Sequence, residues 1–257
     1  MSILKLILKA AAPLPKLEGF SRYLFIGPHP DDIEIGCGAT VSKLTSLGKE
    51  VSFLICMDGR YGFDNAPKDM TPEALIQIRK NEALESAKRL GVDDVHFLEL
   101  CDGGFYDRMQ LREGIAKRVG IFRPDVIFSV DPDVTSECHI DHLNVGQESK
   151  IVANFASNSP IMNRLGAESC NVKAIALYMT AKPNRFVGTR NHVEKQLDSI
   201  FSVHLSQFPE GCPQANSISL YLKLRAIFFG IRSFKGQAEG FRVLDSTHMH
   251  CMPEGGN

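Results

Sequence analysis

Short apolar runs alternate with longer segments of helical periodicity along most of the chain. The apolar runs have the length and aliphatic content of buried strands, and the longer segments repeat apolar residues every three or four positions, as a helix packed on one face does. The predicted strands cover residues 23–27, 51–56, 95–100, 125–131, 172–180 and, less regularly, 236–243. The predicted helices cover residues 39–49, 71–90, 107–122, 143–156, 192–203 and 217–231.

The long helix that begins at residue 71 illustrates the local signals behind these limits. Thr71 can cap the helix, Pro72 is tolerated in its first turn, and Gly91 ends it. Because strands and helices alternate at the spacing of βαβ units, we predict an α/β fold. The expected architecture is a Rossmann-like, mostly parallel sheet with helices on both faces.

The net charge of the chain argues against nucleic acid as its partner. The 257 residues carry a formal net charge of −1, so the basic surplus that binds a nucleic-acid backbone is missing.

Near the N-terminus, Lys5 and Lys9 interrupt the apolar residues, which favours a short amphipathic helix over a signal peptide. A weak contact of this helix with a membrane surface stays open. No stretch reaches the apolar length that a membrane span needs.

The cysteines point to a reducing compartment. Seven of them are scattered along the chain without a Cys-x-x-Cys pair, and several stand inside apolar runs, as Cys56 does. This usage is typical of reduced, buried cysteines, so we expect a cytoplasmic protein without a disulfide framework or a zinc finger.

Two polar clusters follow the first and fourth predicted strands. Residues 27–40 read Gly-Pro-His-Pro-Asp-Asp-Ile-Glu-Ile-Gly-Cys-Gly-Ala-Thr, and residues 139–142 read His-Ile-Asp-His. In sheets of this kind ligands bind beyond the carboxyl ends of the strands. Both clusters are therefore expected in the ligand crevice.

These residue types suit the hydrolysis of an amide. A bound zinc ion activates water and polarises the carbonyl, and it usually takes three protein ligands. His29, Asp32 and His142 supply two histidines and one carboxylate. Asp31 is then left as a base, and His139 as an acid or oxyanion partner. Asp141 stands between the two downstream histidines and can orient one of them through its ring N–H.

Simpler interpretations remain for each motif alone. A His-Pro-Asp-Asp run is compatible with an ordinary turn, and a His-x-Asp-His run with a helix cap whose histidines are solvated. Gly36 and Gly38 also resemble part of a dinucleotide-binding loop, but Val41 stands where the third glycine belongs. A tight turn and close helix packing explain these two glycines better.

The two clusters together resemble the PIG-L/LmbE-like family of zinc-dependent N-deacetylases. The resemblance rests on His-Pro-Asp-Asp-x-Glu-x-Gly-x-Gly-x-Thr at 29–40 and on His-x-Asp-His at 139–142. Weaker landmarks stand at residues 79–82, 100–103, 123–128, 204–207 and 238–242. The similarity runs from about residue 23 to residue 243, which implies one domain there, an N-terminal extension at 1–22 and a C-terminal tail at 244–257. Ala39 departs from the family pattern, which often has glycine at this position.

The resemblance also implies functions for individual residues. It implies metal ligation by His29, Asp32 and His142, with Zn²⁺ as the expected ion and Fe²⁺ as an alternative. Asp31 would be the general base, and His139 the general acid or oxyanion stabiliser. Arg79 and Asp102 would line the sugar pocket. The loop at 58–65 differs from the shorter forms of the family, and the sequence is equally compatible with substrate contact by Arg60, Tyr61 and Asp64 and with a solvated loop.

The expected reaction is removal of the N-acetyl group from an N-acetylglucosamine-type sugar or its conjugate. One rival is an amidase that cleaves a larger acyl group, and another is a non-catalytic sugar- or nucleotide-binding module. A homo-oligomer is expected, and a trimer or a hexamer would fit a family of this kind. His204 is expected to be structural or to reach a neighbouring subunit's pocket, and the His-Met-His-Cys tract at 248–251 is expected to be a terminal segment without a metal.

Overall fold

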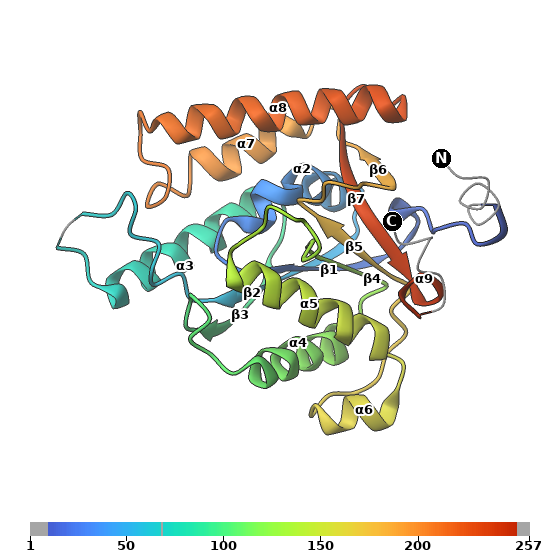
Figure 1. Ribbon diagram of the computed structural model, residues 1–257. Helices are drawn as coiled ribbons and strands as arrows, with labels where there is room; N and C mark the ends of the chain where they lie inside the picture. Colours follow the sequence, from blue (N-terminus) through green and yellow to red (C-terminus); the bar gives the residue numbers. More distant parts are fainter. Residues whose placement is uncertain (1–9, 68, 251–257) are drawn as a thin grey trace.

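The protein, as a computed structural model that describes residues 10–67 and 69–250, is built around a seven-stranded mixed sheet (Figure 1). The strand order is β3-β2-β1-β4-β5-β7-β6. The first five strands in this order are parallel, and β7 runs antiparallel to both β5 and β6. The strands are β1 (Arg22–Gly27), β2 (Glu50–Met57), β3 (Asp94–Leu100), β4 (Val126–Val130), β5 (Ala174–Tyr178), β6 (Arg185–Gly188) and β7 (Ala238–Asp245).

Helices cover both faces of the sheet, as Figure 1 shows. They are η1 (Leu17–Gly19), α2 (Asp32–Ser46), α3 (Pro72–Arg89), α4 (Arg108–Phe122), α5 (Ile140–Phe155), α6 (Ser159–Arg164), α7 (Val193–Phe201), α8 (Pro213–Ser233) and α9 (Ser246–His250). One core joins α2 and α3 to one face of the sheet, and a second joins α4, α5 and α6 to the other face. Alternate residues of β1 point into each core: Tyr23 and Phe25 into the first, Leu24 and Ile26 into the second.

The predicted Rossmann-like architecture is confirmed, whereas several element limits were wrong. α2 begins at Asp32 rather than at residue 39, so Gly36 and Gly38 lie within a helix and not in a phosphate-binding loop. α5 begins at Ile140 and α8 at Pro213, each a few residues before its predicted start. The short elements α6 and β6 were not predicted, because segments of this length carry little periodicity.

The packed structure continues on both sides of residues 23–243. Leu17 is buried in the first core and Leu244 in the second. β7 extends to Asp245, which pairs with Ala174. Most of the predicted N-terminal amphipathic helix, residues 1–9, lies outside the described residues, as do residues 251–257 of the predicted tail. Within the described part, no helix is both long and apolar enough to cross a bilayer.

α2 is broken one turn after it begins. Cys37 has the non-helical backbone angles φ −158° and ψ 22°, so the first turn, which contains Asp32, is a separate piece from the rest of the helix. Both glycines beside the break allow close packing. A Cβ atom at Gly36 would stand 2.2 Å from the ring of Tyr178, and one at Gly38 would stand 2.9 Å from Gln196 Cγ.

Side chains from two other elements satisfy the backbone groups that the break frees. The Glu239 carboxylate of β7 accepts from the N–H of Thr40 at 2.7 Å and from that of Ala39 at 3.3 Å. Gln196 Nε2 of α7 donates to the carbonyl oxygens of Glu34 at 2.8 Å and Ile35 at 3.3 Å. Buried backbone groups without partners are costly, so Glu239 and Gln196 together stabilise the break and fix the direction of the turn that contains Asp32.

The hydrogen bonds from the Ala39 and Thr40 N–H groups to Glu239 lead to a testable prediction. In Glu239→Ala two backbone N–H groups lose their acceptor, which should lower the free energy of unfolding by about 1–3 kcal/mol. The turn with Asp32 should also become less well placed, so the affinity for a divalent metal should fall roughly 10-fold. Denaturant unfolding and a competitive metal titration measure the two effects.

Glu168→Ala is the matched control, because the Glu168 side chain is 85% exposed. It should change stability by less than about 0.5 kcal/mol. Loss of stability without any loss of metal affinity in Glu239→Ala would show that the break does not position Asp32.

Candidate metal centre

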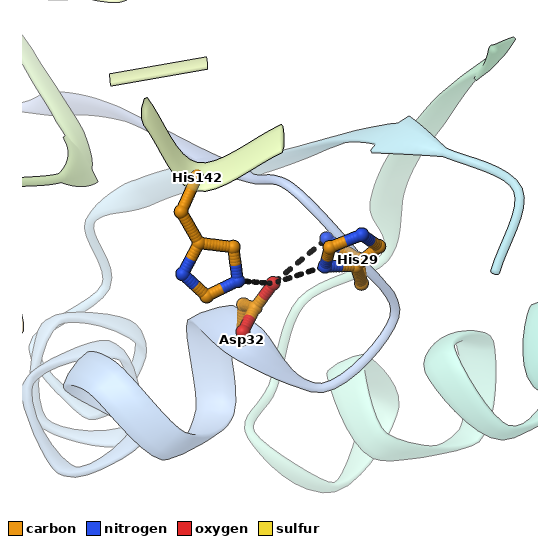
Figure 2. Close-up of side chains that lie close together, drawn as sticks. All are labelled: His29, Asp32 and His142. Atoms are coloured by element: carbon orange, nitrogen blue, oxygen red, sulfur yellow. Dashed lines mark hydrogen bonds and ion pairs between the residues drawn. The ribbon is translucent and has the colours of Figure 1, made fainter. Parts of the chain in front are cut away.

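The candidate site lies where two segments meet at one edge of the sheet. β1 and β4 are neighbouring parallel strands, so the segments that follow them emerge side by side. The first segment contains His29, Asp31 and Asp32, and the second contains His139 and His142. Figure 2 shows the side chains of His29, Asp32 and His142 turned toward one another.

One carboxylate oxygen of Asp32 lies between the two histidines. Its Oδ2 is 3.1 Å from His29 Nδ1 and 3.3 Å from His142 Nε2. One potential ligand atom from each of the three residues lies within 4.8 Å of the other two. The side chains of His29, Asp32 and His142 are 10%, 9% and 14% exposed. The structure therefore brings together the three residues that the sequence suggests as metal ligands.

Two further carboxylates hold the remaining ring nitrogens. His29 Nε2 lies 3.1 Å from Asp141 Oδ2, and His142 Nδ1 lies 3.0 Å from Glu137 Oε2. In metal sites such carboxylates fix the ring orientation and the tautomer of a ligand histidine. Two imidazole nitrogens and one carboxylate oxygen suit Zn²⁺ or Fe²⁺ and leave coordination positions open. By the chemistry of its donors, the set fits a divalent metal.

The electrostatics of this group favour positive charge between the ligands. Burial opposes protonation of His29, but its hydrogen bonds to Asp141 and Asp32 raise its pKa to about 10. Burial likewise opposes protonation of His142, yet the Asp32 carboxylate raises its pKa to about 9. Burial disfavours the ionised form of Asp32, but His142 and His29 hold its pKa well below its usual range. A divalent cation would replace the protons on the two rings.

Asp31 has a strained backbone directly beside these ligands. Its φ of 122° and ψ of −26° lie in a region that residues other than glycine rarely adopt, at a cost of about 1–3 kcal/mol. Its carboxylate lies 3.5 Å from Arg79 Nη2 and lines a cavity. Burial raises the pKa of Asp31 to about 6, although the Arg79 guanidinium opposes this shift. A carboxylate with a pKa near neutrality is suited to accepting a proton.

His139 faces the same cavity as Asp31. Its side chain is 49% exposed, and its ring centroid lies 4.7 Å from that of His29. Burial and the positive charges of His29 and His142 lower the pKa of His139, which favours the neutral ring. Its Nδ1 accepts from the Asp141 backbone N–H at 3.3 Å. In the neutral ring the proton is therefore on Nε2, which can donate.

Asp141 connects the site to the loop after β3. Its carboxylate accepts from the backbone N–H groups of Gly103 at 2.7 Å and Gly104 at 2.9 Å, in addition to its contact with His29. Both glycines have a positive φ, 74° and 81°, which lets two successive N–H groups point at one carboxylate. Asp141 is fully buried, so it orients His29 from behind and has no access to substrate.

A cavity of about 290 Å³ adjoins the metal centre. Its lining residues are His29, Asp31, Tyr61, Gly62, Asp64, Arg79, Asp102, Gly103, His139 and Gln207. Its volume is close to the lower end of the range for small-ligand pockets.

The three residues predicted to contact substrate are placed differently from one another. Arg79 lines the cavity, but its guanidinium also donates to the carbonyl oxygens of Pro30 at 2.9 Å and Gly59 at 3.2 Å. Asp102 lines it too and accepts from the N–H groups of Gly59 and Tyr61. Both side chains thus hold the backbone around the cavity as well as facing it. Arg60 pairs with Asp58, its Nε 2.9 Å from the carboxylate, and is not among the lining residues.

Sequence reasoning missed Glu137 and Gln207. Glu137 belongs to neither polar cluster, and only its position five residues before His142 could have suggested the contact. Gln207 belongs to a weak motif, and the sequence does not show that it reaches the cavity.

The other histidines considered from the sequence lie elsewhere. His204 is fully buried, with Nε2 3.5 Å from Glu34 Oε1. His248 bonds to Asp245 at 2.7 Å, and neither it nor His250 belongs to a metal-compatible group among the described residues. Cys251 of the same tract lies outside the described residues.

Comparisons with known proteins find similarity to a family of deacetylases. Residues 24–153 match the PIG-L family, described as GlcNAc-PI de-N-acetylase. Diacetylchitobiose deacetylase of Thermococcus kodakarensis is 32% identical over 236 residues, which cover 90% of this chain and 86% of that protein. A 1D-myo-inositol 2-acetamido-2-deoxy-alpha-D-glucopyranoside deacetylase of Kineococcus radiotolerans is 33% identical over 127 residues, covering 48% of this chain and 35% of that protein.

A solved structure is similar over almost the whole chain. It is N,N'-diacetylchitobiose deacetylase from Pyrococcus horikoshii, complexed with its inhibitor MPG. It has a TM-score of 0.86 and 29% sequence identity, and the similarity covers 99% of this chain and 97% of that one. The family match contains both polar clusters, and the similarity to the T. kodakarensis relative covers 90% of this chain. This chain therefore belongs to the PIG-L family.

Proposed function

We propose that the protein is a metal-dependent N-deacetylase that hydrolyses the acetamide of an N-acetylglucosamine-type sugar or its conjugate. One observation carries the proposal: Asp31 and His139 face one cavity beside the group formed by His29, Asp32 and His142. By their names, the T. kodakarensis and K. radiotolerans relatives act on diacetylchitobiose and on a 2-acetamido-2-deoxyglucose joined to inositol. Both compounds contain an N-acetylated glucosamine, which is the unit that we assign to the cavity.

The proposed metal is zinc, with ferrous iron as the alternative that the same donors suit. When bound to His29, Asp32 and His142, the cation would lower the pKa of water and polarise the acetamide carbonyl. The carboxylates of Asp141 and Glu137 keep the two ligand rings in the orientation that presents Nδ1 of His29 and Nε2 of His142.

Asp31 and His139 have complementary parts in the proposed reaction. The Asp31 carboxylate accepts the proton of the attacking water, since it lines the cavity directly beside the ligand Asp32 and burial raises its pKa to about 6. His139 Nε2–H donates to the oxygen on which negative charge develops, because its Nδ1 is already engaged by the Asp141 N–H. The proton held by Asp31 then passes to the departing amine, and acetate leaves.

Two rival functions are less well supported. Cleavage of a larger acyl group has less support, because the relatives with named substrates are deacetylases. A sugar-binding module would have no use for a strained carboxylate next to the metal ligands, whereas strain of this kind is typical of active sites.

A cytoplasmic location remains our prediction from cysteine usage, and the six described cysteines are free.

The proposal predicts metal-dependent release of acetate. The protein is stripped with a chelator, reloaded with zinc, and incubated with N-acetylglucosamine, diacetylchitobiose and inositol-linked N-acetylglucosamine. Acetate and free amine should form in equal amounts only after reloading, because the amide needs an activated water. N-butanoyl analogues of the same sugars serve as the matched controls and should react more slowly. Inactivity on every acetamido sugar, with one metal bound per chain, would refute the deacetylase function.

Asp31→Asn separates the base from the metal ligands. The amide has the same shape but accepts a proton poorly, so turnover should fall about 10²–10⁴-fold while the bound metal is retained. His142→Ala is the companion variant and should lose both metal and turnover. Steady-state kinetics together with metal analysis of the purified variants make the comparison. Wild-type turnover in D31N would exclude Asp31 as the base.

A further inference from the structure

Gln207 lines the cavity beside the metal centre, and the proposed reaction gives it no part. The other lining residues all precede residue 140, whereas Gln207 belongs to the segment that joins α7 to α8. Its side chain is half-buried. A neutral amide does not exchange protons in the way that a carboxylate or an imidazole does. Its contribution is therefore either support of the cavity wall or recognition of the ligand.

The backbone around Gln207 is held from two sides. Its N–H donates to the His204 carbonyl oxygen at 3.1 Å, and its own carbonyl oxygen accepts from Asn65 Nδ2 at 2.7 Å. The preceding residue, Ser206, donates to the Glu82 carboxylate of α3 through its N–H at 2.8 Å and its hydroxyl at 2.6 Å. The position of Gln207 is therefore fixed before any ligand binds, which lowers the entropic cost of using its side chain in recognition.

The side-chain amide of Gln207 also has a defined orientation. Nε2 donates to the Gly62 carbonyl oxygen at 3.0 Å and lies 3.4 Å from the Ser206 hydroxyl. A backbone carbonyl only accepts, so the nitrogen and not the oxygen belongs at this position. Oε1 has no donor from residues 10–67 and 69–250, and it is not one of the buried atoms that lack partners. It is therefore an accessible acceptor on the cavity wall.

Arg79 places a donor beside this acceptor. A Cβ atom at Gly62 would stand 2.6 Å from Arg79 Nη1 and 3.0 Å from Gln207 Oε1, so both groups lie against a residue without a side chain. At the other end of the guanidinium, Nη2 lies 3.5 Å from the Asp31 carboxylate. Arg79 thus spans the distance from the proposed base to Gln207. A hydroxyl both accepts and donates, so it suits a neighbouring pair of N–H donor and carbonyl acceptor.

The charges of the cavity favour a hydroxyl over an anion as the partner of Gln207. Three carboxylates line the cavity, those of Asp31, Asp64 and Asp102, against the guanidinium of Arg79. Because like charges repel, this balance disfavours a phosphate or carboxylate ligand at the wall that Gln207 forms. A hydroxyl carries no charge and offers the proton that Oε1 lacks.

The inference rests on the proposed function, so the ligand is an amino sugar. Its anomeric oxygen carries the conjugate and has no proton, which leaves the hydroxyls at C3, C4 and C6 as donors. We propose that Gln207 Oε1 accepts a hydrogen bond from one of these three hydroxyls. Gln207 is then a specificity-determining residue, which selects for the amino sugar that carries this hydroxyl in the right place.

Equilibrium binding of methyl glucosaminide tests the proposal, because this ligand has no acetamide left to hydrolyse. It is titrated calorimetrically into the zinc-loaded protein, beside its 3-, 4- and 6-deoxy analogues. The wild type should bind one of the analogues at least ~3-fold more weakly than the parent sugar. In Gln207→Met the parent should bind about 3–10-fold more weakly, and the penalty for that one analogue should shrink by the same factor, because the acceptor is already gone.

Two controls separate recognition from support of the wall. Ser206→Ala loosens the same segment but keeps the acceptor, so it should weaken the parent and all three analogues by one common factor. Gln77→Met, on the exposed side of α3, should leave every affinity unchanged. If Gln207→Met does not fold, Gln207→Asn takes its place, because it keeps the amide but withdraws the oxygen by one methylene group.

The proposal is overturned if the folded Gln207 variant weakens all four sugars by one common factor or leaves all of them unchanged. It is also overturned if the wild type binds none of them. Acetate release from acetamido sugars is measured in parallel. Coupling between Gln207 and one hydroxyl, without release of acetate from any acetamido sugar, would support this inference and refute the deacetylase function, so the two failures are distinguishable.

Discussion

The shared oxygen of Asp32 is the constraint on which the rest of the site depends. Its Oδ2 lies within hydrogen-bonding distance of His29 Nδ1, and His142 Nε2 is 3.3 Å away. Burying charges without partners costs several kcal/mol each, so the surroundings must compensate the charges on Asp32, His29 and His142. Asp141 and Glu137 do so by holding the outer nitrogens of the two rings. The same contacts leave the inner nitrogens directed at one point, which is the geometry that a cation requires.

Elements distant in the sequence hold this small group in place. β1 and β4 deliver the two histidines to one edge of the sheet, and the loop after β3 supplies backbone donors to Asp141. The break in α2 detaches the turn that contains Asp32, and Glu239 satisfies the amides that the break frees. The site is therefore formed by short segments fixed on rigid strands and helices, which is how accurate positioning is normally achieved.

The sequence was sufficient for the parallel sheet and for the grouping of His29, Asp32 and His142, because both depend on local patterns. Strand ends are visible as apolar runs, and ligand residues follow them directly. The break in α2 was not predictable, since its caps come from α7 and β7, far away along the chain. The pairing of Arg60 with Asp58 depends on the fold of one loop, which composition does not specify. The apolar periodicity of α8 is visible in the sequence, but only the structure shows which of its apolar side chains are exposed.

We propose above all that His29, Asp32 and His142 together hold a catalytic cation. Anomalous diffraction at the zinc absorption edge, from crystals of zinc-loaded protein that releases acetate, tests it most directly. We expect one metal per chain, bonded to Nδ1 of His29, Nε2 of His142 and the Asp32 carboxylate at about 2.0–2.2 Å. A metal bound only at other residues, or full activity in crystals and solution without any metal, would contradict it.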